Sequence, residues 1–375
     1  MKRRTSSTKL WSTLSKQAAR SARQFSRTVT KTVTRPMLRA AKQQGEAVSK
    51  AVGHAVGKAA RQAMTGVVTP ARPPVSRGGG YWEEGLWGFG LGIGSMGQRR
   101  YRVFVPPGVS ASRPAPLLVL LHGCGQDAAS FAACARVATV ARDARWVVLM
   151  PEQSVQANAQ RCWNWFRPAA RGTSEAALLM SMIDHVSQRY AILANRVCAF
   201  GLSAGGAMAM MLGLRYPERF AAIGSHSGAA PYSAINATQA PKAMRGERGP
   251  DPVAARLVLA GRQPPPLLLL HGDDDGVVSY DNATATAAMW LELLPPGAQP
   301  PTALPARRVR RGTRRAVDVF DWQSGPRPYL RVVKVEGLRH AWSGGAPGQA
   351  FADPGGPDAL KIALRFFSVN GRQRD

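Results

Sequence analysis

The pentapeptide Gly201-Leu202-Ser203-Ala204-Gly205 holds the side chain of this sequence best suited to nucleophilic chemistry. The apolar run Val197–Phe200 precedes it with the length of a strand, and the helix-length apolar run Gly206–Leu214 follows it. This strand–turn–helix context is typical of a nucleophile elbow, in which small neighbours permit the strained backbone of an exposed serine. Backbone N–H groups at the start of the helix would favour negative charge that develops beside it. The sequence therefore predicts that Ser203 is a nucleophile.

A serine hydroxyl needs a histidine that removes its proton, and the histidine needs an acid that fixes its tautomer. On an elbow of this kind the chain order is serine, acid, histidine. His226 follows Ser203 too soon for an acid to intervene, and His271 directly precedes the acids. His340 lies just after the apolar run Leu330–Val335, where a loop can carry it over the edge of a sheet. The order and spacing therefore favour His340 as the base.

The acid is expected in the loop after the apolar run Leu267–Leu270. Three adjacent carboxylates occupy that loop: Asp273, Asp274 and Asp275. Each could be the partner of the histidine, while the others could cap the turn or the helix that follows. The residue pattern alone leaves these three alternatives open.

Two backbone N–H groups are candidates for stabilising an oxyanion. The residue after the nucleophile, Ala204, supplies the first by its position on the elbow. The strand-length run Leu117–Leu121 leads into His122-Gly123-Cys124-Gly125-Gln126, a glycine-flanked turn suited to presenting the second. We predict that the N–H of Cys124 is this second donor.

The elements that must position these residues follow from the alternation of apolar runs along the chain. Unbroken apolar strands that alternate with helices predict an α/β fold with a mostly parallel, doubly wound sheet covered on both faces. Residues 240–264 and 295–327 are expected to be surface excursions, the latter with a solvated cluster of arginines at 307–315. The expected strands are Tyr101–Val105, Leu117–Leu121, Val147–Met150, Val197–Phe200, Ala221–Gly224, Leu267–Leu270 and Leu330–Val335. The expected helices are Ala128–Arg142, Glu175–Gln188, Gly205–Leu214, Ala283–Leu294 and Asp358–Phe367.

Charge is distributed unevenly along the 375 residues, which carry 50 Lys and Arg against 22 Asp and Glu, a formal charge of +28. Residues 1–80 hold 17 of the basic residues and one acid, Glu46. We predict two parts, a basic, partly helical or disordered arm at 1–80 and a domain at 81–375. The arm could be a solvated tail or could bind an anionic granule or membrane surface through residues 1–78; nucleic acid is the less favoured partner.

Several classes of protein are disfavoured by composition. No apolar run approaches the roughly 20 residues of a membrane span, so no transmembrane helix is predicted. Lys2-Arg3-Arg4 is not followed by the apolar run of a secretion signal. The four cysteines lack metal-binding spacing, and Cys198 is expected to be a buried core thiol. No metal or organic cofactor is implied.

Taken together, these segments resemble the esterase family of bacterial polyhydroxybutyrate depolymerases, related to feruloyl and acetylxylan esterases, over about residues 98–368. The resemblance implies an α/β-hydrolase fold, and the H-G-x-x-D-x-x-V pattern frequent in that fold selects Asp275. The segments that carry it most specifically are Cys162-Trp163-Asn164-Trp165-Phe166 and His340-Ala341-Trp342-Ser343-Gly344-Gly345.

The resemblance also implies a reaction and a substrate class. It implies two-step hydrolysis of a short-chain polyhydroxyalkanoate or its oligomers, with feruloyl or acetylxylan esters as the alternative. A binding protein on an inactive hydrolase scaffold is the rival from another class. A Cys124–Cys162 bridge is implied, and Trp163, Trp165 and Trp342 could either line the substrate site or pack in the core. Family members are often secreted, which would place the chain outside the cell, whereas the missing signal favours a cytoplasmic or granule-associated protein.

Overall fold

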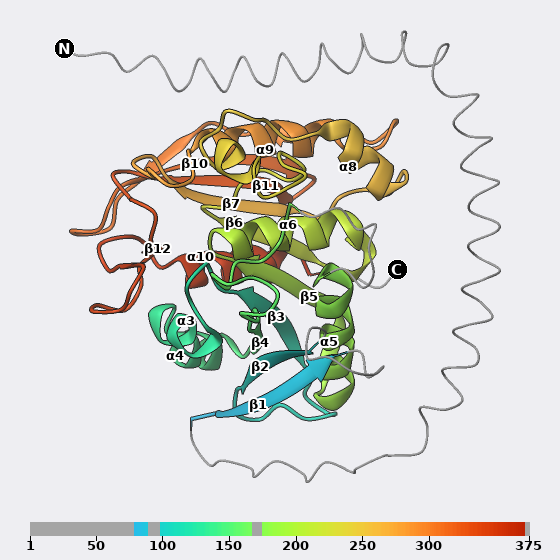
Figure 1. Ribbon diagram of the computed structural model, residues 1–375, viewed down its shortest axis with the longest axis vertical. Coiled ribbons are helices and arrows are strands. Elements are labelled where there is room, and N and C mark those ends of the chain that lie inside the picture. Colours follow the sequence, from blue (N-terminus) through green and yellow to red (C-terminus); the bar gives the residue numbers. More distant parts are fainter. Residues whose placement is uncertain (1–78, 89–97, 167–174, 372–375) are drawn as a thin grey trace, which may run out of the picture. The chain divides into compact units, whose positions relative to one another are not determined.

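The computed structural model describes residues 79–88, 98–166 and 175–371 (Figure 1). All but the last two residues of the expected basic arm, 1–80, lie outside these ranges, and so do its expected helices. Among the described residues, no helix has both the length and the apolar character that crossing a bilayer would require.

The described residues form a mixed sheet of 11 strands in the order β1-β2-β4-β3-β5-β6-β7-β11-β10-β8, with β9 beside β10. The central strands β4, β3, β5, β6, β7 and β11 run parallel, while the strands at both ends of the sheet are antiparallel. This is the mostly parallel sheet that the unbroken apolar runs predicted. The strands are β1 (Tyr81–Gly88), β2 (Gln98–Val105), β3 (Ala115–Leu121), β4 (Val147–Pro151), β5 (Ile192–Gly201), β6 (Ala222–His226), β7 (Leu267–Gly272), β8 (Thr302–Ala303), β9 (Arg307–Val309), β10 (Val317–Ser324) and β11 (Arg327–Val335).

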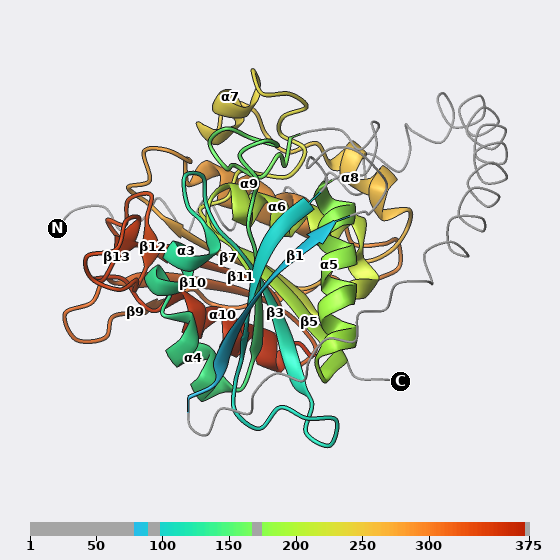
Figure 2. The same ribbon diagram turned by 60° about the horizontal axis from the view of Figure 1, so that its bottom comes forward.

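Helices cover both faces of this sheet, as predicted (Figure 2). The pair α4 and α10 packs together on one face, and α5, α6 and α8 lie next to one another on the opposite face, with α9 against β7 and β11. The central strands β3, β4 and β7 are buried from both sides, which explains why they consist mainly of Val and Leu with little alternation. The helices are α3 (Ala128–Cys134), α4 (Val137–Ala144), α5 (Glu175–Arg189), α6 (Ala204–Arg215), the single 3-10 turn η2 (Pro217–Arg219), α7 (Ala240–Met244), α8 (Pro252–Leu259), α9 (Asp281–Glu292) and α10 (Ala359–Val369).

The register of the parallel strands brings their carboxyl ends to one edge of the sheet. Leu121 at the end of β3 pairs with Gly201 at the end of β5, and Val335 at the end of β11 pairs with Gly272 at the end of β7. Loops that leave these ends therefore lie close to one another. A separate two-stranded pair, β12 (Trp342–Ser343) and β13 (Ala352–Asp353), closes the loop that follows β11.

Two predictions about local structure are wrong. The expected single helix Ala128–Arg142 is two helices, because Arg136 adopts a left-handed backbone conformation (φ 54°) between α3 and α4. The expected surface excursion 295–327 contains β8, β9 and β10 and extends the sheet. Within β10, Phe320 and Trp322 are buried beside a buried acid, Asp321, which obscured the strand pattern. The other expected excursion, 240–264, holds the short helices α7 and α8.

Candidate active site

Ser203 lies at the turn between β5 and α6 and adopts φ 56° and ψ −121°, the strained backbone of an elbow. The residues two positions before and after it must be glycine because the turn is tightly packed. A Cβ on Gly205 would lie 2.3 Å from the carbonyl oxygen of Leu121, and one on Gly201 would lie 2.4 Å from the carbonyl carbon of Gly205. These contacts explain the G-x-S-x-G spacing: any side chain at either glycine would push the elbow away from β3 or distort it.

The structure brings Ser203, His340 and Asp275 together, although they are far apart in sequence. His340 Nε2 lies 3.0 Å from Ser203 Oγ, and His340 Nδ1 lies 2.8 Å from Asp275 Oδ2. An ionised carboxylate can only accept a hydrogen bond, so Nδ1 carries the ring proton and Nε2 presents its lone pair to the serine hydroxyl. The arrangement can therefore move a proton from the serine to the imidazole while the carboxylate holds the ring in place.

Asp275 is held in its ionised form. Burial alone would raise its pKa, but hydrogen bonds from His271 and His340 hold the pKa well below its ordinary value. Its other oxygen, Oδ1, accepts the backbone N–H groups of Val277 and Val278 at 3.0 and 2.9 Å. A buried carboxylate with so many donors stays charged and fixed in orientation.

The two neighbouring carboxylates have other partners. Asp273 Oδ1 accepts the backbone N–H of Gly337 at 2.6 Å, which joins the end of β7 to the loop after β11. Asp274 is 62% exposed and faces Arg339 at 3.5 Å. Of the three alternatives that the sequence left open, Asp275 is the one placed against His340.

The two predicted oxyanion donors differ from the N–H groups beside them. Among the described residues, no acceptor takes the backbone N–H of Cys124 or of Ala204. The flanking N–H groups are in use: Gly123 donates to Gln126 Oε1 at 2.9 Å, and Gly125 donates to the carbonyl of Gln160 at 2.8 Å. Polar N–H groups without partners in an otherwise satisfied turn are available to bind a ligand oxygen.

The turn that holds Cys124 is anchored from three directions. A disulfide joins Cys124 to Cys162, the bridge that the resemblance implied. His122 donates through Nδ1 to the carbonyl of Gly123 at 2.8 Å and accepts the N–H of Gln153 through Nε2 at 3.0 Å. Trp163 Nε1 donates to the carbonyl of His122 at 3.1 Å. These contacts fix the backbone whose N–H is the candidate donor.

The three tryptophans that could line the substrate site are largely buried. Trp342 is fully buried and stacks on His226, with ring centroids 5.2 Å apart. Trp163 is 1% exposed. A side chain without accessible surface cannot form the wall of an open site, so the core alternative is favoured for both. Trp165 is 6% exposed and packs edge-on against Phe166.

His226 has a positioning role that the sequence did not predict. Its Nε2 accepts the backbone N–H of Ser343 at 3.1 Å, and its carbonyl accepts the N–H of Ser203 at 2.8 Å. One buried residue thereby contacts both the elbow and the loop that carries His340. The histidine had been excluded as a base from its chain position, and nothing in the sequence indicated these contacts.

Two buried histidines predict loss of stability in mild acid. Burial lowers the pKa of His122 to about 4 and holds that of His226 well below its ordinary value. Both are therefore neutral in the folded chain but bind a proton near pH 6.5 when unfolded. Stability is fully present above pH ~6.5 and falls as the pH drops towards the folded values; for His122 the loss at pH ~5 is about 2 kcal/mol.

Chemical denaturation at neutral and mildly acidic pH measures this loss. The carboxylate of Asp275, whose pKa is lowered, keeps its contribution until the pH falls below ~4, so it does not act in the same interval. A His226→Gln variant should show a smaller difference between the two pH values than the wild type. An equal difference in both proteins would contradict the assignment to His226.

Comparisons with known proteins identify relatives of this chain. Residues 99–314 match the family described as Esterase PHB depolymerase, a range that includes Ser203 and Asp275 but ends before His340. The chain is 32% identical over 210 residues to poly(3-hydroxyalkanoate) depolymerase C of Paucimonas lemoignei, covering 54% of this chain and 49% of that protein. It is 31% identical over 134 residues to feruloyl esterase B of Neurospora crassa, covering 35% of this chain and 44% of the relative.

The chain thus spans about half the length, or less, of these curated relatives. Among solved structures, an acetyl xylan esterase from Aspergillus awamori superposes with a TM-score of 0.57 over 72% of this chain and 94% of that one, at 16% identity. That likeness supports the α/β-hydrolase fold expected from the sequence. Because the family match extends over more than half of the sequence, the chain belongs to the Esterase PHB depolymerase family.

Proposed function

We propose that this chain is a serine esterase in which Ser203, His340 and Asp275 form the catalytic triad. The observation that carries the proposal is the 3.0 Å approach of His340 Nε2 to Ser203 Oγ, with an ionised carboxylate 2.8 Å behind the ring. The serine sits on a strained elbow, where its hydroxyl is presented at the start of α6. All three residues fall within 81–375, which we propose as the esterase domain.

The proposed reaction has two steps. Ser203 Oγ attacks the ester carbonyl while His340 Nε2 takes the hydroxyl proton, and Asp275 stabilises the resulting imidazolium. The N–H groups of Cys124 and Ala204 hold the oxyanion of the tetrahedral intermediate. The imidazolium then protonates the departing alcohol, and a water molecule activated by His340 releases the acyl group from the serine.

The proposed substrate is a short-chain polyhydroxyalkanoate or one of its oligomers. The family description and the depolymerase relative support this class. The feruloyl esterase relative supports a feruloyl ester as the alternative, because its identity over the matched range is nearly the same. We also propose that Trp165 lines the part of the site that holds the acyl chain of the substrate.

Hydrolysis of three substrates tests the proposal. We expect the purified chain to cleave p-nitrophenyl butyrate and to clear a suspension of amorphous polyhydroxybutyrate, with little turnover of methyl ferulate. Cleavage of p-nitrophenyl butyrate without clearing of the polymer would support esterase activity and contradict depolymerase activity. Preferential cleavage of methyl ferulate would support the alternative substrate class, feruloyl esters. Failure to cleave any of the three esters would contradict the proposal that the chain is an esterase.

A further inference from the structure

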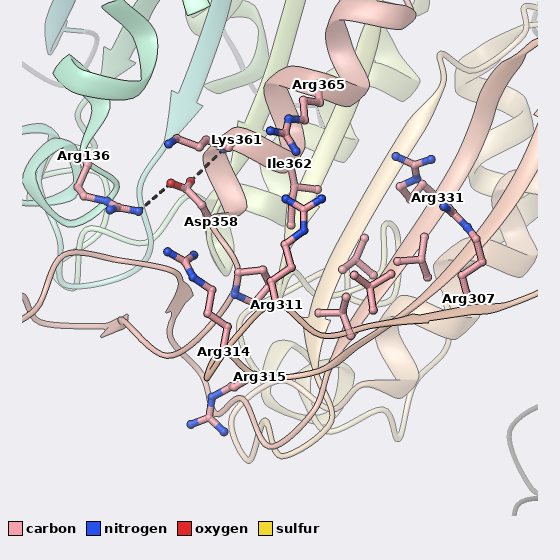
Figure 3. Close-up of a pocket in the computed structure, with 15 residues that line it drawn as sticks. Arg136, Arg307, Arg311, Arg314, Arg315, Arg331, Asp358, Lys361, Ile362 and Arg365 are labelled. Atoms are coloured by element: carbon pink, nitrogen blue, oxygen red, sulfur yellow. Dashed lines mark hydrogen bonds and ion pairs between the residues drawn. The ribbon is translucent and has the colours of Figure 1, made fainter. Parts of the chain in front are cut away.

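A cationic groove of about 500 Å³ lies between α10, the neighbouring strands β9, β10 and β11 and the loop that joins β9 to β10 (Figure 3). The arginine cluster at 307–315, which the sequence predicted to be a solvated loop, contributes much of its lining. In Figure 3, Arg311 extends from this loop toward α10, and Arg307 and Arg331 stand at the other end. The cations that line the groove are Arg136, Arg307, Arg311, Arg314, Arg315, Arg331, Lys361 and Arg365.

Half of these cations have an acidic partner. Asp321 accepts from both Arg307 and Arg331, at 2.8 and 2.6 Å. Asp353 pairs with Arg315 at 2.8 Å, and Asp358 pairs with Arg136 at 2.7 Å. Three carboxylates therefore balance most of the charge of these four arginines and hold their side chains in place.

The other four cations have no acidic partner among the described residues. Arg314 donates to the carbonyl of Gly356 at 3.3 Å. The side chains of Arg311, Lys361 and Arg365 are exposed, and no hydrogen bond or ion pair joins them to the described part of the chain. Like charges gathered in one groove repel one another, so a bound anion would relieve that repulsion.

The floor of the groove is aliphatic. Between the cations lie the side chains of Val309, Val317, Val319, Val333 and Ile362. No aromatic ring is among the described residues that line the groove, although base stacking on such rings is what usually holds single-stranded nucleic acid. An aliphatic floor with a cationic rim instead fits an amphiphile that has an anionic head and an alkyl body.

We infer that this groove binds the phosphate headgroup of an anionic phospholipid and docks the enzyme on a lipid surface. Guanidinium groups suit phosphate because their planar donors match its oxygens, and the valine floor would contact the glycerol and the first methylene groups. The formal charge of the chain, +28, attracts it to the same surface. The site is separate from the proposed triad, since none of its lining residues belongs to that set.

Co-sedimentation of the full chain with vesicles tests the inference. The vesicles contain phosphatidylglycerol and phosphatidylcholine in equal parts, with pure phosphatidylcholine for comparison. The groove variant is Arg311→Gln, Lys361→Gln and Arg365→Gln. Its binding to the anionic vesicles should weaken by about a hundredfold, equivalent to about 3 kcal/mol, or about 1 kcal/mol for each cation near the surface.

A matched control separates the groove from net charge. The variant Arg113→Gln, Lys242→Gln and Arg248→Gln also removes two arginines and a lysine, all exposed and outside the groove. The affinity of this control for the anionic vesicles should fall by less than about tenfold, because the control keeps the clustered cations of the groove. Unchanged hydrolysis of p-nitrophenyl butyrate by the groove variant would establish that it is folded; if the chain hydrolyses no ester, thermal unfolding supplies that control, so failure of the proposed function leaves this test intact.

Three outcomes would overturn the inference. Groove and control variants that bind the anionic vesicles equally well would remove the groove as the docking site. Stabilisation of the wild type by soluble glycerol phosphate, without tighter binding to anionic than to neutral vesicles, would assign a free phosphate ligand instead. Loss of affinity for a single-stranded oligonucleotide in the groove variant, with vesicle binding like that of the control, would assign nucleic acid.

Discussion

Replacing Ser203 by alanine is expected to lower kcat for p-nitrophenyl butyrate by about a millionfold, equivalent to about 8 kcal/mol of barrier. In the proposed reaction, the hydroxyl oxygen is the atom that forms the acyl-enzyme, and no other described side chain is placed 3.0 Å from His340 Nε2 to replace it. The two N–H groups of Cys124 and Ala204 would remain and could still polarise an ester carbonyl, so residual turnover about a thousandfold or more above the uncatalysed reaction is expected. Initial rates with a chromogenic ester measure the loss directly.

Ser225→Ala is the matched control for this variant. Ser225 is another buried serine next to the elbow, and its hydroxyl has no hydrogen-bond partner among the described residues. Its removal should leave turnover within a few-fold of the wild type, because no contact that holds the triad depends on it. Comparable activity in Ser203→Ala and Ser225→Ala would contradict the assignment of the nucleophile.

Replacing Asp275 by asparagine is expected to lower kcat by about ten-thousandfold with little effect on folding. The amide has nearly the same shape but lacks the charge that stabilises the imidazolium. It can also donate a hydrogen bond to His340 Nδ1, which would leave the proton on Nε2 and block proton removal from Ser203. The ratio of kcat between variant and wild type is the quantity to measure.

Asp274→Asn and Asp273→Asn test the register of the acid loop. Asp274 is exposed, and its charge is screened by solvent, so its variant should differ little from the wild type. Asp273 holds the N–H of Gly337, so its variant should mainly lower stability. A larger loss of kcat in either variant than in Asp275→Asn would show that Asp275 is not the acid of the triad.

The site could be predicted from the sequence because its parts follow from chain order. The elbow was recognisable from its glycines and from the strand and helix on either side of Ser203. His340 followed by elimination, since the other histidines stand too early in the chain. The choice of Asp275 needed the family pattern, because three carboxylates in a row look alike until the backbone around them is known.

The contacts that support the site could not be predicted, because they join residues distant in sequence. His226 contacts the elbow and Ser343 across 117 positions, a pairing that no local pattern encodes. The extension of the sheet by β10 was also missed, since Asp321 interrupts its apolar alternation and is compensated only by arginines from β9 and β11. The cationic groove depends on that extension and was missed with it.

The proposed triad is assembled from residues up to 137 positions apart, carried at or just after the ends of three different strands. Ser203 can be activated only in chains where β5, β7 and β11 are all in register and the loop after β11 is closed. A reagent that phosphonylates activated serines would therefore count correctly folded molecules one by one. In a mixture of folded and misfolded chains, the labelled fraction would equal the native fraction. Labelling of the serine would therefore measure how much of the preparation has a correctly formed sheet.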